Sequence, residues 1–407
     1  MAFSLSRNAK LYVTTSQTIA AMTNANTWEV PVLDGFNFTA NTATQEIEIS
    51  EAGETPVRGQ QVFTTAIEPV DWSMQAYIRP RFNTLNTQVD AVERILWEAL
   101  AAGPKPANPI TTNANGSATT RNEGSAAGLA INFNDSNRNE LLQLSLVFNL
   151  GTSTSPVWYH IVGAVVDTAE IDFAIDAIAS ITWTGFGTNV SEVTDSTDLI
   201  SLSAMLTNTN GDWLDSAFPD GTAGYLPAPT GVQACIRNKL STVSLVGKSG
   251  TDYGNSYTLA LTGGTLTIAN NITFLTPEAL GVVNNPCGHF TGQRVISGNM
   301  TAYLKTGGTN DTADLLNDIL THSNSAAGAD PTDFELTINV GGIAPASPYN
   351  TPVVQLLMAG AHLVIPTINI EDVVSVDIPF NALPYNGTAP DPEATNELTV
   401  AYYADES

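Results

Sequence analysis

The chain has 407 residues, of which 43% are hydrophobic and only 13% are charged. Ordinary soluble domains have roughly 25% charged residues, and here Thr, Asn, Ser, Ala and Gly replace them, which is typical of many short strands and turns and of a surface that other subunits cover. The net charge of −26, from 40 acidic and 14 basic residues, argues against a protein that grips nucleic acid, because phosphate binding needs clustered lysine and arginine. Such a chain is expected to repel DNA.

The two cysteines, Cys235 and Cys287, form neither a disulfide framework nor a zinc motif. No apolar segment follows the charges at the N-terminus, so we expect no signal peptide. The most apolar late stretch, residues 353–365, is too short to cross a bilayer. We therefore expect a protein that is made in the cytosol and does not engage membranes.

The N-terminal part of the chain resembles the C-terminal part. The matching segments keep their order along the chain, and their offsets drift slowly from 230 to 224 before a step to 197. The clearest matches are Gly35 to Asn41 with Gly264 to Asn270 (offset 229), Met74 to Arg79 with Met300 to Lys305 (offset 226), Gly163-Ala164 with Gly360-Ala361 (offset 197), and Ile181 to Trp183 with Ile378 to Phe380 (offset 197). This internal repeat predicts two homologous domains in tandem.

Turn and linker residues separate the two copies. Between them lie Asn210-Gly211-Asp212, Pro219-Asp220-Gly221 and Pro227-Ala228-Pro229, which are typical of loops. We therefore predict a first domain over residues 1–193, a linker over 194–230 and a second domain over 231–407.

Each copy has one segment in which apolar and polar residues alternate. This pattern predicts a strand with one buried face and one face toward water or a lumen. The candidate positions on the polar face are Ser73, Gln75, Tyr77 and Arg79 in the first copy, and Ser297, Asn299, Thr301, Tyr303 and Lys305 in the second.

A helix is predicted after each of these strands. In the first copy Val89, Val92, Leu96, Ala99 and Leu100 form an apolar stripe. In the second copy the stripe is Leu315, Leu316, Ile319 and Leu320, with Asp311 as the N-cap. With the further strands expected near residues 144–150, 158–166, 178–183, 334–340, 353–364 and 373–380, each copy is predicted to be an antiparallel sandwich or partly open barrel with one flanking helix, a mainly β, β-rich α+β fold.

Motifs for catalysis or metal binding are incomplete. The four histidines are scattered, and Gly247-Lys248-Ser249 lacks the first glycine of a phosphate loop because Thr242 holds that position. The acidic turn at residues 135–139 lacks the glycine and the final acid of a calcium loop. We expect no enzyme, no metal and no cofactor.

Two segments of the first copy carry a family resemblance. The segment Glu51, Ala52, Gly53, Glu54, Thr55, Pro56, Val57, Arg58, Gly59 and the segment Pro69 to Pro80 closely resemble the tail tube (major tail) proteins of long-tailed bacteriophages. Residues 263–277 and 361–373 agree in the second copy. The match is to the siphophage variant in which the tube domain is duplicated within one chain.

The resemblance implies a virion structural protein that assembles with itself. Three chains with two domains each form a trimeric, pseudo-hexameric ring, and rings stack head to tail into a hollow tube, the conduit for DNA ejection. Strands from all domains join around the lumen, where the alternating polar positions above are candidates. Long hairpins near residues 45–60 and 275–293 reach the next ring, with Glu51 to Gly59 as the stacking loop. The tape measure, tail terminator and distal tail proteins are the implied partners.

Two other readings stay open from the residues alone. One is a different virion structural protein, such as a tail-tip adaptor or a capsid decoration protein. The other is a carbohydrate-binding module for host attachment, which an exposed cluster of aromatic residues would favour. The six tryptophans mostly fall in predicted strands or helices, which indicates core positions instead.

Overall fold

The first half of the chain supplies a run of strands and one helix. The computed structural model describes residues 9–23, 26–47, 61–82, 89–101, 116–118, 129–133, 141–151, 156–206, 213–215, 224–226, 236–248, 256–277, 285–323, 334–341, 353–385 and 397–403. The elements of the first half are β1 (Lys10–Thr14), β2 (Thr27–Val30), β3 (Asn37–Thr39), β4 (Thr42–Ile47), β5 (Gln61–Ile67), β6 (Val70–Tyr77), β7 (Pro80–Phe82), β8 (Val89–Ala91), α1 (Arg94–Ala101), β9 (Gly116–Ala118), β10 (Leu129–Asn132), β11 (Leu144–Asn149), β12 (Trp158–Asp172), β13 (Ser180–Gly187) and β14 (Asn189–Glu192).

The second half repeats this mixture after a connecting region that has structure of its own. The predicted linker contains α2 (Ser196–Leu206) and the small hairpin of β15 (Trp213–Asp215) and β16 (Gly224–Leu226). The elements that follow are β17 (Thr242–Gly247), β18 (Ala260–Ala269), β19 (Thr273–Leu275), β20 (Gly288–Phe290), β21 (Val295–Tyr303), α3 (Thr312–Ser323), β22 (Phe334–Val340), β23 (Val353–Leu363), β24 (Thr367–Asn369), β25 (Ser375–Ala382) and β26 (Thr399–Tyr403).

The two halves pair their strands in the same order. In the first half the antiparallel neighbours run β1, β11, β12, β13, β6, β3. In the second half they run β17, β22, β23, β25, β21, β18. The equivalent strands β11 and β22 also share an irregularity. The register of β11 shifts between Leu144 and Leu146, and that of β22 shifts between Phe334 and Leu336.

Strand pairing corrects two offsets of the sequence repeat. Met74 pairs with Trp183 and Met300 pairs with Ile378, so Ile378, not Phe380, occupies the place of Trp183 and the offset is 195 rather than 197. Phe38 pairs with Trp72 and Leu266 with Gly298, so the early strands are offset by 228 rather than 229. The match of β6 with β21 at 226 and of Ala164 with Ala361 at 197 agrees with the pairing.

A large residue and a glycine exchange places between the copies. In the first half the Trp72 ring lies over Gly185, and in the second the Phe380 ring lies over Gly298, where an added Cβ would be 2.4 Å from the nearest ring atom in each case. The aromatic residue has moved from one strand of the pair to the other. This exchange explains the wrong offset, because Phe380 matches Trp183 in kind but fills the space that belongs to Trp72.

One sheet and one core join the halves. β12 pairs with β18 over five positions, from Thr168 with Ala269 to Asp172 with Thr265. β10 pairs with β26 in a second junction. Buried apolar residues from Leu11 to Tyr402 form a single contiguous cluster. The halves therefore pack as one body, and the domain boundaries stay a prediction.

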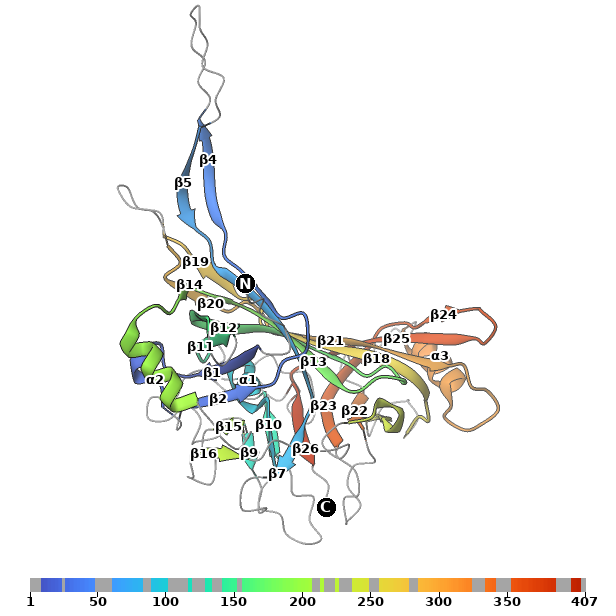
Figure 1. Ribbon diagram of the computed structural model, residues 1–407. Helices are drawn as coiled ribbons and strands as arrows, with labels where there is room; N and C mark the ends of the chain where they lie inside the picture. The colour runs from blue at the N-terminus through green and yellow to red at the C-terminus, as the bar shows by residue number, and fades with distance from the viewer. Residues whose placement is uncertain are drawn as a thin grey trace, which may run out of the picture.

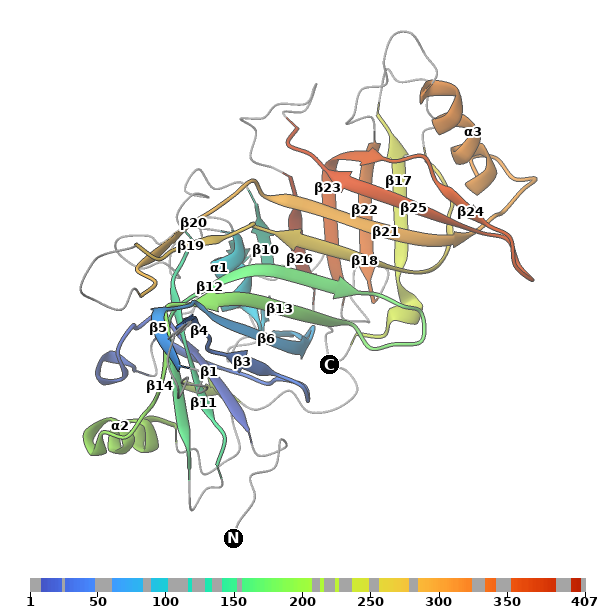
Figure 2. The ribbon, with the colours of Figure 1, turned by 90° about the horizontal axis from the view of Figure 1, so that it is seen from above.

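Eight strands form what we call the central band: β3, β6, β13, β12, β18, β21, β25 and β24. Figure 2 shows most of them side by side, crossing from the first half to the second. Residues alternate between buried and accessible along β6, β13 and β25. The apolar face packs on the core.

Helix α1 lies inside the fold, and all of its residues are buried. The Trp97 ring meets the Trp183 ring edge-on, with centroids 5.0 Å apart. The helix begins at Arg94, so the prediction that Val89 and Val92 lie in it was wrong: Val89 pairs with Phe82 in the β7–β8 hairpin, and Val92 lies in the turn before the helix. Helix α3 begins as predicted, since the Asp311 carboxylate accepts hydrogen bonds from the backbone N–H groups of Ala313 and Asp314.

The predicted fold class, a mainly β fold with few helices, is confirmed. The described strands form a large open sheet and several small ones, without a closed barrel. No helix within the described part of the chain is long and apolar enough to cross a membrane.

Candidate functional site

The accessible face of the central band is polar and continuous across both halves. Residues directly opposite each other in antiparallel strands share a face. One such row crosses the band as Gln75, Thr182, Glu170, Thr267, Ser297 and Asn381, and it continues to His362 on the adjoining strand β23. The predicted positions Ser73, Gln75, Tyr77, Ser297, Asn299 and Thr301 are partly accessible, and Tyr303 is exposed. The strand pairing therefore brings these positions of the two copies onto one surface.

Arg79 and Lys305 follow the ends of their strands, because β6 ends at Tyr77 and β21 at Tyr303. The Arg79 guanidinium carbon lies 5.6 Å from the centre of the Tyr77 ring, which is within cation–π range. Lys305 is exposed.

Carboxylates lie on this polar face. Glu170 and Asp172 are exposed on β12. Asp377 on β25 is held in place, because its carboxylate accepts hydrogen bonds of 2.7 Å from the Thr301 hydroxyl and 2.6 Å from the Asn369 amide. A surface of hydroxyl, amide and carboxylate groups can face water and repels polyanions.

The band ends in two strand edges. At one end β3 pairs with β6, and at the other β24 pairs with β25. Among the described residues neither edge strand has a second neighbour. Large apolar side chains gather beside β24, with exposures of 50% for Ile365, 45% for Ile368, 82% for Ile370 and 59% for Val373. Exposed strand edges and apolar side chains of this kind indicate a surface that pairs with another chain.

Two hairpins of unequal length interrupt the band at equivalent places. β4 and β5 pair from Thr42 with Ile67 to Ile47 with Gln61, and Figure 1 shows this hairpin projecting away from the rest of the described fold. Val62 and Phe63 on it are 57% and 48% exposed. The predicted stacking loop, Glu51 to Gly59, lies outside the described residues. In the second half β19 and β20 form a shorter pair, from Thr273 with Phe290 to Leu275 with Gly288.

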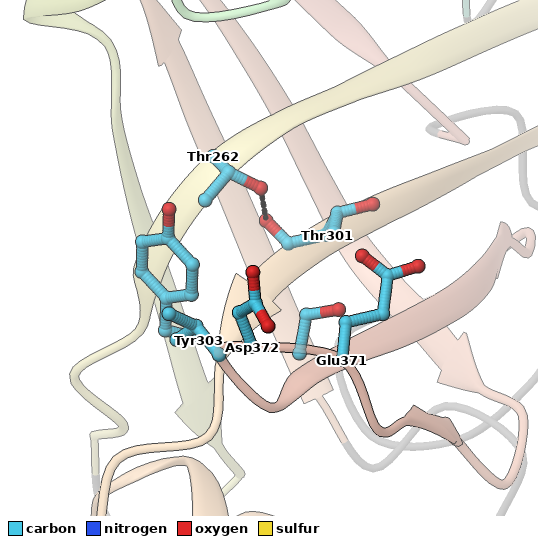
Figure 3. A pocket seen from close by; sticks show the side chains of 7 residues that line it. Thr262, Thr301, Tyr303, Glu371 and Asp372 are labelled. Atoms are coloured by element: carbon cyan, nitrogen blue, oxygen red, sulfur yellow. Dashed lines mark hydrogen bonds between the residues drawn. The ribbon is translucent and has the colours of Figure 1, made fainter.

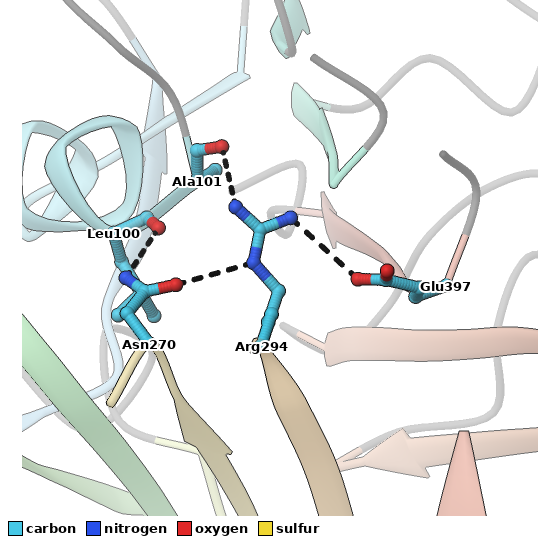
Figure 4. Close-up of polar contacts among 5 residues, drawn as sticks. All are labelled: Leu100, Ala101, Asn270, Arg294 and Glu397. Carbon is cyan, nitrogen blue, oxygen red and sulfur yellow. Dashed lines mark hydrogen bonds and ion pairs between the residues drawn. The ribbon is translucent and has the colours of Figure 1, made fainter. Parts of the chain in front are cut away.

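A buried polar network ties the halves together where β12 meets β18 (Figure 4). The Asn270 amide donates to the Leu100 carbonyl at 2.9 Å, and its oxygen accepts from Arg294 Nε at 3.2 Å. Arg294 Nη2 also donates to the Ala101 carbonyl at 3.1 Å, and Nη1 lies 3.6 Å from a Glu397 carboxylate oxygen. The C-terminal carbonyls of α1 thus gain donors and a positive charge from the second half.

A second buried contact joins the last strand to α1. The Tyr402 hydroxyl donates to a Glu93 carboxylate oxygen at 2.6 Å and accepts from Trp97 Nε1 at 2.6 Å. Burial removes Glu93 from water and raises its pKa from 4.5 to about 7. Burial and the neighbouring carboxylate also raise the pKa of Tyr402 well above its usual value. The Glu93 carboxyl group at this junction therefore titrates near neutral pH.

A polar pocket of about 550 Å³ lies beside the β24 edge. Figure 3 shows Thr262, Thr301 and Tyr303 around it, together with the carboxylates of Glu371 and Asp372. The lining contains no basic residue, and the described residues contain no cluster of three side chains suited to a metal ion.

Sequence reasoning missed both buried junction networks. The contacts of Asn270 with Leu100 and of Tyr402 with Glu93 join residues 170 and 309 positions apart. No local motif marks such residues, because their partners are set by strand pairing over long distances. A buried Asn, Arg or Glu in an otherwise apolar segment is the only signal that a sequence could offer.

Comparison with known proteins gives one informative match. No family model matches the chain. The chain is 28% identical over 392 residues to the tail tube protein pb6 of Escherichia phage T5, which covers 94% of this chain and 73% of that protein. The match extends through both halves of the fold. The resemblance predicted from the sequence is thereby confirmed, and the chain is a relative of a bacteriophage tail tube protein along almost its entire length.

Proposed function

We propose that the chain is a structural protein of a phage virion that assembles with itself into the tube of the tail. The observation that carries this proposal is the central band, a sheet that crosses both halves with one polar face and ends at two unpaired edges among the described residues. The similarity to pb6 supports the same role. Open edges at both ends suit a contact that repeats from chain to chain.

In the proposed ring three chains each contribute one central band, built from strands of both halves. Closing such a sheet on itself removes its edges, which would otherwise promote aggregation. The polar face then lines a lumen, with the candidate positions from Ser73 to Arg79 and from Ser297 to Lys305 on its wall. Because the halves differ in their hairpins and in the α2 region, the ring has threefold rather than true sixfold symmetry.

The lumen serves as the conduit for DNA during ejection into the host. Glu170, Asp172 and Asp377 lie on the polar face, and their negative charge keeps the DNA backbone from adhering to the wall. This passage does not depend on the DNA sequence. The tape measure, tail terminator and distal tail proteins are the further partners that a tail tube requires.

Rings stack through the long hairpin of the first half. The outer part of β5, residues 61–64, is exposed and carries apolar side chains at Val62 and Phe63. A projecting hairpin with apolar side chains suits insertion into a neighbouring ring. The contact is head to tail, so it continues as a tube.

Replacement of the hairpin tip tests this function. A variant in which residues 51–59 become a Gly/Ser segment of equal length keeps the hairpin closed but removes its side chains. We expect the unchanged protein to form hollow tubes by negative-stain electron microscopy and the variant to stop at single rings. A matched variant, Ile200→Ser, changes an exposed residue of α2 and should form tubes. If the tip variant assembles tubes of normal length, the hairpin does not connect the rings.

Among the described residues, the tryptophans do not form the exposed cluster that would favour a carbohydrate-binding module. Trp28, Trp72, Trp97, Trp158 and Trp183 are all buried, so these rings are not available as a sugar-binding platform. The adaptor and decoration alternatives predict single rings or separate particles in the same microscopy experiment.

A further inference from the structure

The junction inside the chain predicts the residue-by-residue contact between chains. We propose that β24 of one chain pairs with β3 of the next copy in antiparallel register, with Thr367 opposite Thr39, Ile368 opposite Phe38 and Asn369 opposite Asn37. This inference rests on the proposed assembly into rings and specifies its interface. Its partner is a second copy of this chain.

Equivalent positions follow from the strand pairing of the two halves. In the first half Glu170 pairs with Thr182 and Ile171 with Ile181, while in the second Thr367 pairs with Asp377 and Ile368 with Val376. β24 is therefore the counterpart of the end of β12. In the same way Phe38 opposite Trp72 is the counterpart of Leu266 opposite Gly298, so β3 is the counterpart of the middle of β18.

The end of β12 already has the partner that β24 lacks. Inside the chain Glu170 pairs with Thr267, Ile171 with Leu266 and Asp172 with Thr265. Substituting each residue by its counterpart in the other half produces the three proposed pairs between chains. The pairing is antiparallel, as it is in the chain itself.

Burial differs between the two junctions in the way that the proposal requires. Ile171 and Leu266, which pair inside the chain, are both fully buried. Their counterpart Ile368 is 45% exposed, and Phe38 is partly exposed. The apolar pair that is buried at the junction inside the chain therefore corresponds to two accessible residues at the two edges of the band. This indicates that a neighbouring copy covers them.

The next position along the strand repeats this contrast. Phe173 is 2% exposed, its N–H donates to the Gly264 carbonyl at 3.1 Å, and its ring packs against Gly264. Its counterpart Ile370 is 82% exposed. Continued pairing would set Ile370 against the backbone near Phe36 of the next copy, so the most exposed large apolar side chain of the described structure would be covered.

Side-chain chemistry agrees with the register. Thr39, Asn37, Thr367 and Asn369 would lie on the polar face, in line with the Thr and Asn residues of the band. Ile368 and Phe38 would lie on the core face. A shift by one residue would bring Ile368 onto the polar face and a polar residue into the core, so only registers that differ by two residues are close competitors.

Disulfide cross-linking tests the register. In a background with Cys235→Ser and Cys287→Ser, two matched variants carry Thr39→Cys with Thr367→Cys, or Asn37→Cys with Asn369→Cys. Two mismatched variants carry Thr39→Cys with Asn369→Cys, or Asn37→Cys with Thr367→Cys. Each cysteine therefore occurs once in a matched pair and once in a mismatched pair, which controls for reactivity.

The matched variants should cross-link on mild oxidation into a ladder that ends at three chains. We expect at least about tenfold more product than in the mismatched variants, because a disulfide requires Cα atoms within about 7 Å. Equal or greater product in the mismatched pairs, or no product in assembled tubes, would overturn the register and leave the tube function standing. If the unchanged protein formed no tubes, the proposed function would fail separately.

Hydrogen exchange on the unchanged protein provides a test without variants. Within residues 37–39 and 367–370, the amides that point away from β6 and β25 should exchange at least about tenfold more slowly in assembled rings or tubes than in the single chain, because pairing with the next copy protects them. Amides of α2 should not change. If assembly protects neither edge, the proposed pairing is wrong.

Discussion

At the scale of single residues, the contact between Tyr402 and Glu93 makes the junction sensitive to pH. Glu93 is buried, and its pKa is raised to about 7 from 4.5. The folded state therefore holds a proton that the unfolded state releases between these two values. The stability that this proton contributes is fully present below pH ~4.5 and is lost as the pH rises through about 7, for a total of roughly 3 kcal/mol.

Glu93→Gln removes this titration and keeps an oxygen that accepts from the Tyr402 hydroxyl. We expect the variant to unfold at a higher urea concentration than the unchanged protein at pH 8, and at a similar concentration at pH 4.5. The measurement is urea unfolding across this range, with Glu192→Gln on exposed β14 as the control. A constant difference between variant and parent at every pH would show that the pKa of Glu93 is the same in the folded and unfolded states.

Arg294 and Asn270 show how few of the residues at the junction can be found from sequence. Both are buried donors directed at the last carbonyls of α1, and both belong to the other half of the chain. Composition indicated that the surface is largely covered. By contrast with these two residues, Asp311 could be predicted as the N-cap of α3, because its hydrogen-bond partners are only two and three residues away. Arg294 donates to Ala101, which lies 193 positions away, beyond any local pattern.

At the scale of elements, the sequence was sufficient wherever a pattern is local. Alternation located β6 and β21, and helical spacing located α3. Alternation did not fix the offset of β13 from β25, because a shift by two residues leaves every side chain on the same face. Turn residues suggested a linker, although α2 (Ser196–Leu206) lies within it, with Leu202 fully buried against Trp158 and its neighbours.

The aromatic residue and the glycine that face each other lie on opposite strands in the pairs β6–β13 and β21–β25, and from this contact we predict the effect of a larger residue at the glycine. A Cβ at Gly298 would be 2.4 Å from the Phe380 ring and 2.4 Å from the Thr265 carbonyl oxygen. We expect Gly298→Ala to destabilise the fold by about 1–3 kcal/mol through overpacking, measured by chemical unfolding.

Gly288→Ala is the matched control, because an added Cβ there meets no atom within 4 Å. Adding Phe380→Leu to Gly298→Ala should recover part of the loss, since the smaller side chain frees space. If Gly298→Ala were as stable as the control, the close contact between ring and glycine would not constrain the sheet.

At the scale of the whole molecule, the net charge of −26 would repel DNA from the wall of the tube if part of it lines the lumen. Glu170 and Asp172 are exposed on the polar face, and the Asp172 carboxylate accepts a hydrogen bond of 2.8 Å from the Ala174 backbone N–H that lysine would remove. Glu170→Lys with Asp172→Lys should slow DNA ejection from assembled particles, because lysine attracts the phosphate backbone.

Ejection kinetics at low and high salt measure this effect. The slowing should weaken as salt rises, because ions screen the attraction. Glu192→Lys, which makes a similar change outside the central band, should eject DNA at the normal rate. Unchanged kinetics in the double variant would show that these two carboxylates do not face the DNA.

The central claim is that three chains, each with two unequal copies of one sheet, make one ring of a hollow tube. Electron cryo-microscopy of the purified, assembled protein tests it most directly through the rotational symmetry of the tube in cross-section. We predict threefold symmetry, with six similar but alternating units around the lumen and the central band as its wall. Rings of six whole chains, or discrete globular particles under all conditions, would contradict the account.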